Sequence, residues 1–144
     1  MASIGSKVAV RHRGDSEFSI KIRDHELVVD QPYDAGGRNA GPAPTELFVA
    51  SIASSAAFYA RDYLHRHGLP DAVDVDTRWW LELSPTRVTK MSLRIDAPGL
   101  PVDQRKAFRR VVESCTVHNT LRLGVDVSFE LSVDEPDRVP VPFR

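Results

Sequence analysis

The sequence of 144 residues has one cysteine, no block of like charge and no long apolar run. The lone Cys115 excludes an intrachain disulfide framework and favours a reducing compartment, so we expect a cytoplasmic protein. The formal net charge is −1 and like charges form only pairs such as Arg109-Arg110, which argues against a nucleic-acid partner. The longest uncharged run, Leu47 to Ala60, is shorter than the roughly 18 apolar residues of a membrane span. It is interpreted as a buried core helix, and no membrane partner is expected.

Motifs that hold cofactors and metals are missing as well. The sequence has no glycine-rich phosphate loop, no G-x-S-x-G elbow and no paired C-x-x-C. His65 and His67 are two positions apart on a predicted helix, so they point to different faces. Cys115 and His118 would supply only two of the four ligands of a structural zinc site. We therefore predict neither a cofactor nor a metal.

What is present is the composition of one ordinary globular domain. Hydrophobic residues make up 42% and charged residues 27% of the chain, and its length suits a single domain over 1–144. The N-terminus lacks the apolar core of a signal peptide. The Pro-rich end, 134–144, is interpreted as an extended C-terminal tail.

The first half of the chain predicts three strands, a loop and a long helix. Apolar residues alternate with polar ones over 8–12, 18–22 and 27–29, a pattern typical of an antiparallel meander. The Gly- and Pro-rich segment 31–44 is a loop. A helix is predicted to begin at Pro44 and end near His67, and its Ala- and Ser-rich middle favours close packing of a second helix or a symmetry mate.

The second half predicts a hairpin, a second helix and a last strand. Alternation over 73–83 and 91–95 indicates two paired strands with one buried face. A helix is expected over 102–114, with an apolar stripe that ends at Cys115. Residues 121–133 alternate again and predict a final strand. The order βββ-α-ββ-α-β is that of an α+β domain whose mostly antiparallel sheets pack on two helices.

Cys115 itself has three interpretations at this point. Free cysteine is among the most buried residue types, and the apolar stripe favours a core position. If the following residues form a new helical turn, its N–H groups would stabilise a thiolate, helped by a protonated His118. The third interpretation, a metal ligand together with His118, has no further ligands to support it.

Two stretches of the sequence combine into a recognisable pattern. They are "GPAPTELFVASIASSAAF", a helix start followed by a small-residue helix, and "VVESCTVHNTL", a helix that ends in cysteine. Together they resemble the OsmC/Ohr family of hydroperoxide reductases. The resemblance implies an intertwined homodimer with its site at the subunit interface. It also implies a cycle in which one cysteine attacks the peroxide, a second resolves the sulfenic acid as a disulfide, and dithiols supply electrons. An Arg and a Glu activate the attacking thiolate in that family.

Carried over residue by residue, the resemblance places Cys115 at the resolving position and Ser55 at the attacking one. Glu46 fits the OsmC-like pattern P-x-E-L as the carboxylate, and Arg13 matches the arginine best. Arg11 and Arg38 are weaker substitutes for that arginine. A serine cannot form a sulfenic acid or a disulfide, so the two-cysteine cycle cannot run in this chain.

Two functions from different classes follow. In the first, the chain keeps an interfacial pocket for a hydroperoxide or another apolar ligand, lined by Ser55, Cys115, Arg13 and Glu46. Phe58 and Tyr59 would form its aromatic walls. In the second, Cys115 acts as a one-cysteine hydroperoxide reductase that an external thiol regenerates. A cysteine-to-serine replacement made by engineering is a further explanation of Ser55.

Overall fold

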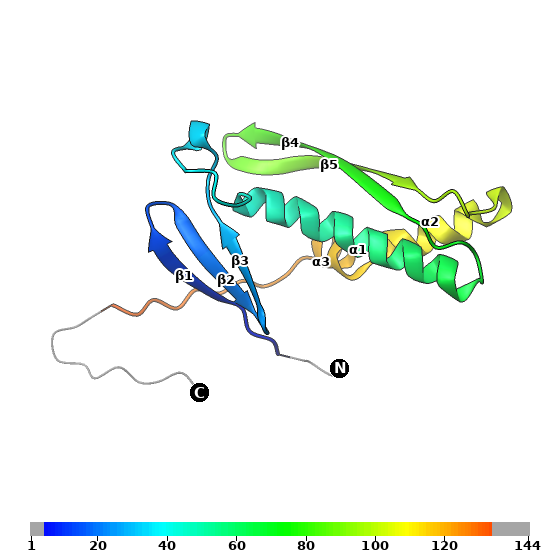
Figure 1. Cartoon of the computed structure of the whole chain (residues 1–144), viewed down its shortest axis with the longest axis horizontal. Helices are drawn as coiled ribbons and strands as arrows, with labels where there is room; N and C mark the ends of the chain where they lie inside the picture. The colour runs from blue at the N-terminus through cyan, green and yellow to red at the C-terminus, as the bar shows by residue number, and fades with distance from the viewer. Residues whose placement is uncertain (1–4, 134–144) are drawn as a thin grey trace.

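The computed structural model describes residues 5–133, which form an α+β domain (Figure 1). Its N-terminal antiparallel sheet has the order β1-β2-β3, with β1 over Ala9–Gly14, β2 over Glu17–Ile22 and β3 over His25–Val29. The register between β1 and β2 shifts between His12 and Gly14, whereas β2 and β3 pair without interruption. The predicted meander is confirmed because local turns and a period of two are enough to specify it.

A long helix and a hairpin form the centre of the molecule. After a loop with the 3-10 turn η1 (Tyr33–Ala35), helix α1 runs over Pro44–Arg66. Strands β4 (Asp74–Leu83) and β5 (Thr86–Asp96) pair antiparallel, and Figure 1 shows this hairpin along one side of α1. Pro44 occupies the first helical turn, as the sequence predicts.

Three short helical segments complete the described chain. The 3-10 turn η2 (Val102–Gln104) leads into α2 (Arg105–Glu113), and α3 spans Thr116–Leu123. Within residues 5–133, no helix combines the length and apolarity needed to cross a membrane.

The core lies where α1 meets α2. Small and large side chains interlock there, and the hairpin covers them with partly buried Leu93 and Ile95. The ring of Tyr63 on α1 meets that of Phe108 on α2 edge-on, with ring centroids 5.5 Å apart, and small alanines share the same cluster. The prediction that a second helix packs on the small residues of α1 is thus confirmed within one chain. The buried cluster consists of Ala56, Ala60, Tyr63, Leu64, Phe108 and Val112.

The predicted final strand over 121–133 is wrong for the described chain. Leu121 and Leu123 belong to α3, Gly124 follows with a positive φ of 81°, and residues 124–133 pair with no strand. Phe129 is 88% and Leu131 92% exposed. An alternating pattern makes a strand only where a neighbouring edge offers hydrogen bonds, and this segment reaches none in its own chain. The predicted tail, 134–144, lies outside the described residues.

Candidate functional site around Cys115

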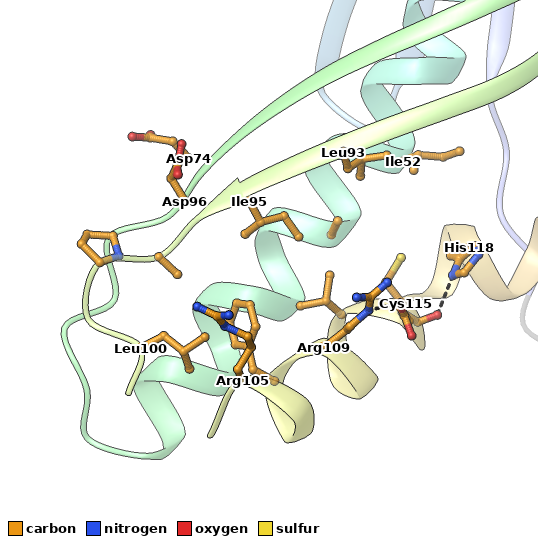
Figure 2. Close-up of a pocket in the computed structure, with 16 residues that line it drawn as sticks. Ile52, Asp74, Leu93, Ile95, Asp96, Leu100, Arg105, Arg109, Cys115 and His118 are labelled. Carbon is orange, nitrogen blue, oxygen red and sulfur yellow. Dashed lines mark hydrogen bonds and ion pairs between the residues drawn. The ribbon is translucent and has the colours of Figure 1, made fainter. Parts of the chain in front are cut away.

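A groove of about 850 Å³ runs between β5 and α2 above the middle of α1. Figure 2 shows its apolar floor, with Cys115 and His118 at one end and Asp74, Asp96 and Arg105 at the other. Its volume is in the range of small-molecule sites. The apolar floor is made by Ile52, Ala56, Leu93, Ile95, Leu100, Phe108 and Val112.

Cys115 is the N-cap of α3 and is 1% exposed. Helix α2 ends at Glu113, the chain turns through Ser114, and the N–H of Asn119 then donates to the carbonyl of Cys115 at 2.9 Å. The helical turn after Cys115, which the sequence left as one alternative, is therefore present. The burial expected of a free cysteine is also confirmed, whereas a stabilised thiolate stays a prediction.

His118 is held by the end of α2 rather than by the thiol. Its Nδ1 lies 2.6 Å from the carbonyl oxygen of Glu113, and since a carbonyl can only accept, Nδ1 donates. That bond leaves Nε2 as the ring nitrogen available to a ligand. No group of three or more His, Cys, Asp or Glu side chains within residues 5–133 is placed to hold a metal ion.

An ion pair flanks Cys115 on the α2 side of the groove. Arg109 Nε lies 2.7 Å from Glu113 Oε1, one helical turn away, and this hydrogen bond to Glu113 raises the pKa of Arg109. The pair is exposed, so its contribution to stability is small. Sequence reasoning missed both residues, although their i,i+4 spacing just before Cys115 could have indicated them.

Ser55 lies on α1 close to the groove but is not among its lining residues. It is half-buried and directly precedes Ala56, which does line the groove. One turn later, the hydroxyl of Tyr59 forms a 3.0 Å hydrogen bond with Thr116 Oγ1, the residue after Cys115. The Ser55 side of α1 therefore faces the start of α3. Phe58, the other predicted aromatic wall, is largely exposed.

Glu46 and Arg13 are occupied elsewhere in the single chain. Glu46 Oε2 accepts the N–H of Ala43 at 2.7 Å and so caps the start of α1. Arg13 on β1 forms ion pairs with Glu17 at 3.4 Å and Glu26 at 3.8 Å. Over residues 5–133, the hydrogen bonds and ion pairs of Glu46 and Arg13 involve neither Ser55 nor Cys115.

The two substitute arginines are also engaged on the N-terminal side. Arg11 donates to the carbonyl of Val10 at 3.1 Å. Arg38 pairs with Asp15 and with Glu17, each at 3.5 Å. The structure thus brings Cys115 close to α1, β5 and α2, and leaves the predicted carboxylate and arginines at the sheet and the α1 start.

Residues 36–130 match the family model described as OsmC-like protein. The chain belongs to the OsmC-like family. No curated protein matches the sequence of this OsmC-like protein. The family match includes the whole of α1, the hairpin and Cys115, which are the elements that form the groove.

Solved structures show the same fold at low identity. A Psychrobacter arcticus protein described as an osmotic stress induced and detoxification response protein is 19% identical, with a TM-score of 0.73, over 83% of this chain and 90% of that one. An organic hydroperoxide resistance protein OsmC from Legionella pneumophila is 20% identical, with a TM-score of 0.63, over 83% and 92%. The organic hydroperoxide resistance protein OhrB of Bacillus subtilis is 19% identical, with a TM-score of 0.58, over 90% and 98%.

Proposed function

We propose that this OsmC-like protein binds a small apolar molecule, such as an organic hydroperoxide, without running a two-cysteine peroxidase cycle. The observation that carries the proposal is that the only thiol of the chain, Cys115, is buried at the end of the groove. The neighbouring α1 position that would supply an attacking thiol holds the hydroxyl of Ser55. A hydroxyl can neither form a sulfenic acid nor close a disulfide with Cys115.

The proposed binding form is a homodimer with the site at the subunit interface. The single chain leaves the alternating apolar segment 125–133 uncovered, and the N-terminal sheet exposes Val10, Phe18 and Leu27. Patches of this kind are typical of association surfaces. A second copy that covers these surfaces can also bring its own Arg13 and Glu46 to the groove of the first copy. Within one chain, neither residue lies at the groove. The segment carries Val125, Val127, Phe129, Leu131 and Val133.

A second candidate function is that of a one-cysteine hydroperoxide reductase, and one observation favours it. Cys115 lines the groove directly before the first turn of α3, where helix N–H groups favour an anion. The thiolate would attack the peroxide to give a sulfenic acid and an alcohol after protonation. One external thiol would then form a mixed disulfide with loss of water, and a second would release Cys115. The reducing cytoplasm, our proposed location, supplies such thiols.

The deciding experiment follows cumene hydroperoxide consumption with dithiothreitol for the native chain and for Ser55→Cys. The binding function predicts no turnover by the native chain and measurable turnover by Ser55→Cys. Ser54→Cys is the matched control, because Ser54 lies on the same helix but on its exposed side. Turnover by the native chain that Cys115→Ser abolishes would establish the reductase instead.

Binding is measured separately with cumyl alcohol, the reduced product, as the probe. The proposal predicts methyl chemical-shift changes at Leu93, Ile95 and Val112, which line the groove, and none at Leu83 on the hairpin tip. Shifts at Leu83 equal to those in the groove would mean that the probe does not use this site.

A further inference from the structure

His118 is fixed at the Cys115 end of the groove by a bond to the end of the preceding helix. Helix α2 ends at Glu113, and the carbonyl groups of a last helical turn have no partner within their own helix. From the first turn of α3, the Nδ1–H of His118 donates to the carbonyl of Glu113 at 2.6 Å. The next residue, Asn119, donates from Nδ2 to the carbonyl of Ser114 at 2.9 Å. The imidazole ring is thus held by a cap that its Nδ1 edge provides.

This bond also decides which ring nitrogen carries the proton. A neutral imidazole has one N–H and one bare nitrogen, and the hydrogen bond made by one nitrogen selects the tautomer. Because the carbonyl of Glu113 can only accept, the proton is on Nδ1 and the lone pair of the neutral ring is on Nε2. Among residues 5–133, the ring of His118 has no second hydrogen-bond partner. Nε2 is therefore an uncommitted acceptor on a residue that lines the groove.

The other polar groups at this end of the groove are poorer acceptors for a neutral ligand. The carboxylate of Glu113 is engaged by Arg109, whose Nε lies 2.7 Å from Oε1, and Arg109 can only donate. The thiol of Cys115 is a weak donor and a weak acceptor. Figure 2 shows these side chains together with His118 at one end of the apolar floor. His118 is the residue among them that offers a neutral nitrogen lone pair.

We infer that His118 determines the specificity of the groove: its Nε2 accepts a hydrogen bond from an O–H of the bound molecule. The inference rests on the proposed binding function. It narrows the ligand class from any small apolar molecule to one with an O–H donor, such as an alkyl hydroperoxide or a tertiary alcohol. The apolar body of the ligand lies on the groove floor, and its O–H lies at the Cys115 end. A ligand of the same shape without this donor leaves Nε2 without a partner, which weakens binding about tenfold.

The test compares cumyl alcohol with tert-butylbenzene, in which a methyl group replaces the hydroxyl. Dissociation constants are measured from groove methyl shifts at about pH 8, where imidazole is neutral. The variant is His118→Asn, because Nδ2 of asparagine matches Nδ1 of histidine in position, so the donor to Glu113 stays and Nε2 is removed. The preference for cumyl alcohol over tert-butylbenzene should be about tenfold smaller in His118→Asn than in the native chain. An unchanged preference would overturn the inference.

A second measurement uses the native chain alone, so it does not depend on how the variant folds. Long-range proton–nitrogen correlation spectra of the histidine rings show which nitrogen carries the proton. His118 should have its proton on Nδ1, and cumyl alcohol should shift its Nε2 resonance whereas tert-butylbenzene should not. Nε2 of His65, which is on α1 and does not line the groove, is the internal control. A proton on Nε2 of His118, or an Nε2 resonance that stays in place while groove methyl groups shift, would overturn the inference.

Failure of this inference and failure of the proposed function give different results. If both compounds shift the methyl groups of Leu93, Ile95 and Val112 with the same relative affinity in the native chain and in His118→Asn, the groove binds apolar molecules and His118 does not select them. If neither compound shifts these methyl groups in the native chain, the proposed binding function is wrong and the inference falls with it.

Discussion

Two buried groups, Asp30 and Cys115, show how differently a single residue can be accommodated in this molecule. Each is 1% exposed. Asp30 stays ionised because the Ser16 hydroxyl and the N–H groups of Ala40, Gln31 and Arg38 hold its pKa well below the usual range, against the effect of burial. Cys115 needs no such network, since a thiol is a weak donor that packs like a small apolar group.

The first prediction concerns the pH dependence of stability. Because the pKa of Asp30 is lower in the folded than in the unfolded state, its contribution is present above the unfolded value of about 3.9 and is lost as the pH falls below it. The urea concentration at the unfolding midpoint of the native chain should therefore fall between about pH 4 and pH 2. The midpoint of Asp30→Asn should fall less over the same pH range, because asparagine does not titrate there. Parallel pH profiles for the two proteins would show that the carboxylate does not supply this stability.

The second prediction concerns the reactivity of the thiol. Because Cys115 is buried, alkylation by iodoacetamide at pH 8 requires local opening and should be about tenfold or more slower than that of an exposed thiol. The comparison is Ser54→Cys in a Cys115→Ala background, which places a thiol on the exposed side of α1. Equal alkylation rates, followed by mass spectrometry, would show that the groove admits reagents to Cys115 freely.

At the scale of the element, the start of α1 shows a residue whose structural role is plain. Pro44 sets the first turn, and Glu46 folds back to accept the N–H of Ala43 at 2.7 Å. This is the carboxylate half of a capping box, and the negative charge also complements the helix dipole. Within one chain, the residue that the family resemblance assigns to catalysis is therefore a helix cap.

The third prediction separates these two roles of Glu46. Glu46→Ala should destabilise the fold by about 0.5–2 kcal/mol in urea unfolding, because an N-terminal N–H loses its acceptor. Glu46→Gln should retain most of this stability, since an amide oxygen can also accept the bond. Equal losses for the two variants would mean that the charge of Glu46, and not its hydrogen bond, stabilises the helix.

At the scale of the whole molecule, the single chain is notable for what it leaves uncovered. The N-terminal sheet packs little against the helices, and the segment after Gly124 carries apolar side chains that are more than two-thirds exposed. Surfaces of this extent favour association. The dimer proposed above would bury them.

The fourth prediction tests that dimer by changing the apolar and then the polar side chains that alternate over the segment 125–133. Phe129→Asp combined with Leu131→Asp places charge on its apolar side, and light scattering should show a loss of dimer in favour of monomer. Ser128→Asp combined with Ser132→Asp adds the same charge to the other side and should leave the dimer intact. Dissociation by both pairs of changes would mean that charge alone, and not the apolar side, governs assembly.

Much of the fold follows from the sequence, because it depends on local periodicity. The strands of both sheets, the long helix and α2 were predicted within a few residues, since a period of two or of 3.6 identifies a buried face wherever it occurs. The sequence left open whether a new helix follows Cys115, and the structure places the residue between α2 and α3. The resemblance of two short motifs predicted the OsmC-like family, which the family match confirms.

What only the tertiary structure decided depends on residues that are distant in sequence. An alternating pattern predicts a strand at 121–133, but a strand needs an edge to pair with, and the described chain provides none for it. Asp30 is an ordinary acidic residue in the sequence and becomes a saturated buried carboxylate only because Ser16 and the 31–42 loop meet it in space. Likewise, Arg13 and Glu46 belong to the predicted site by motif, yet their own chain places them with Glu17, Glu26 and Ala43. The sequence by itself determined the elements and the family, whereas the partners of each charged group were decided by the packing of elements that no local pattern encodes.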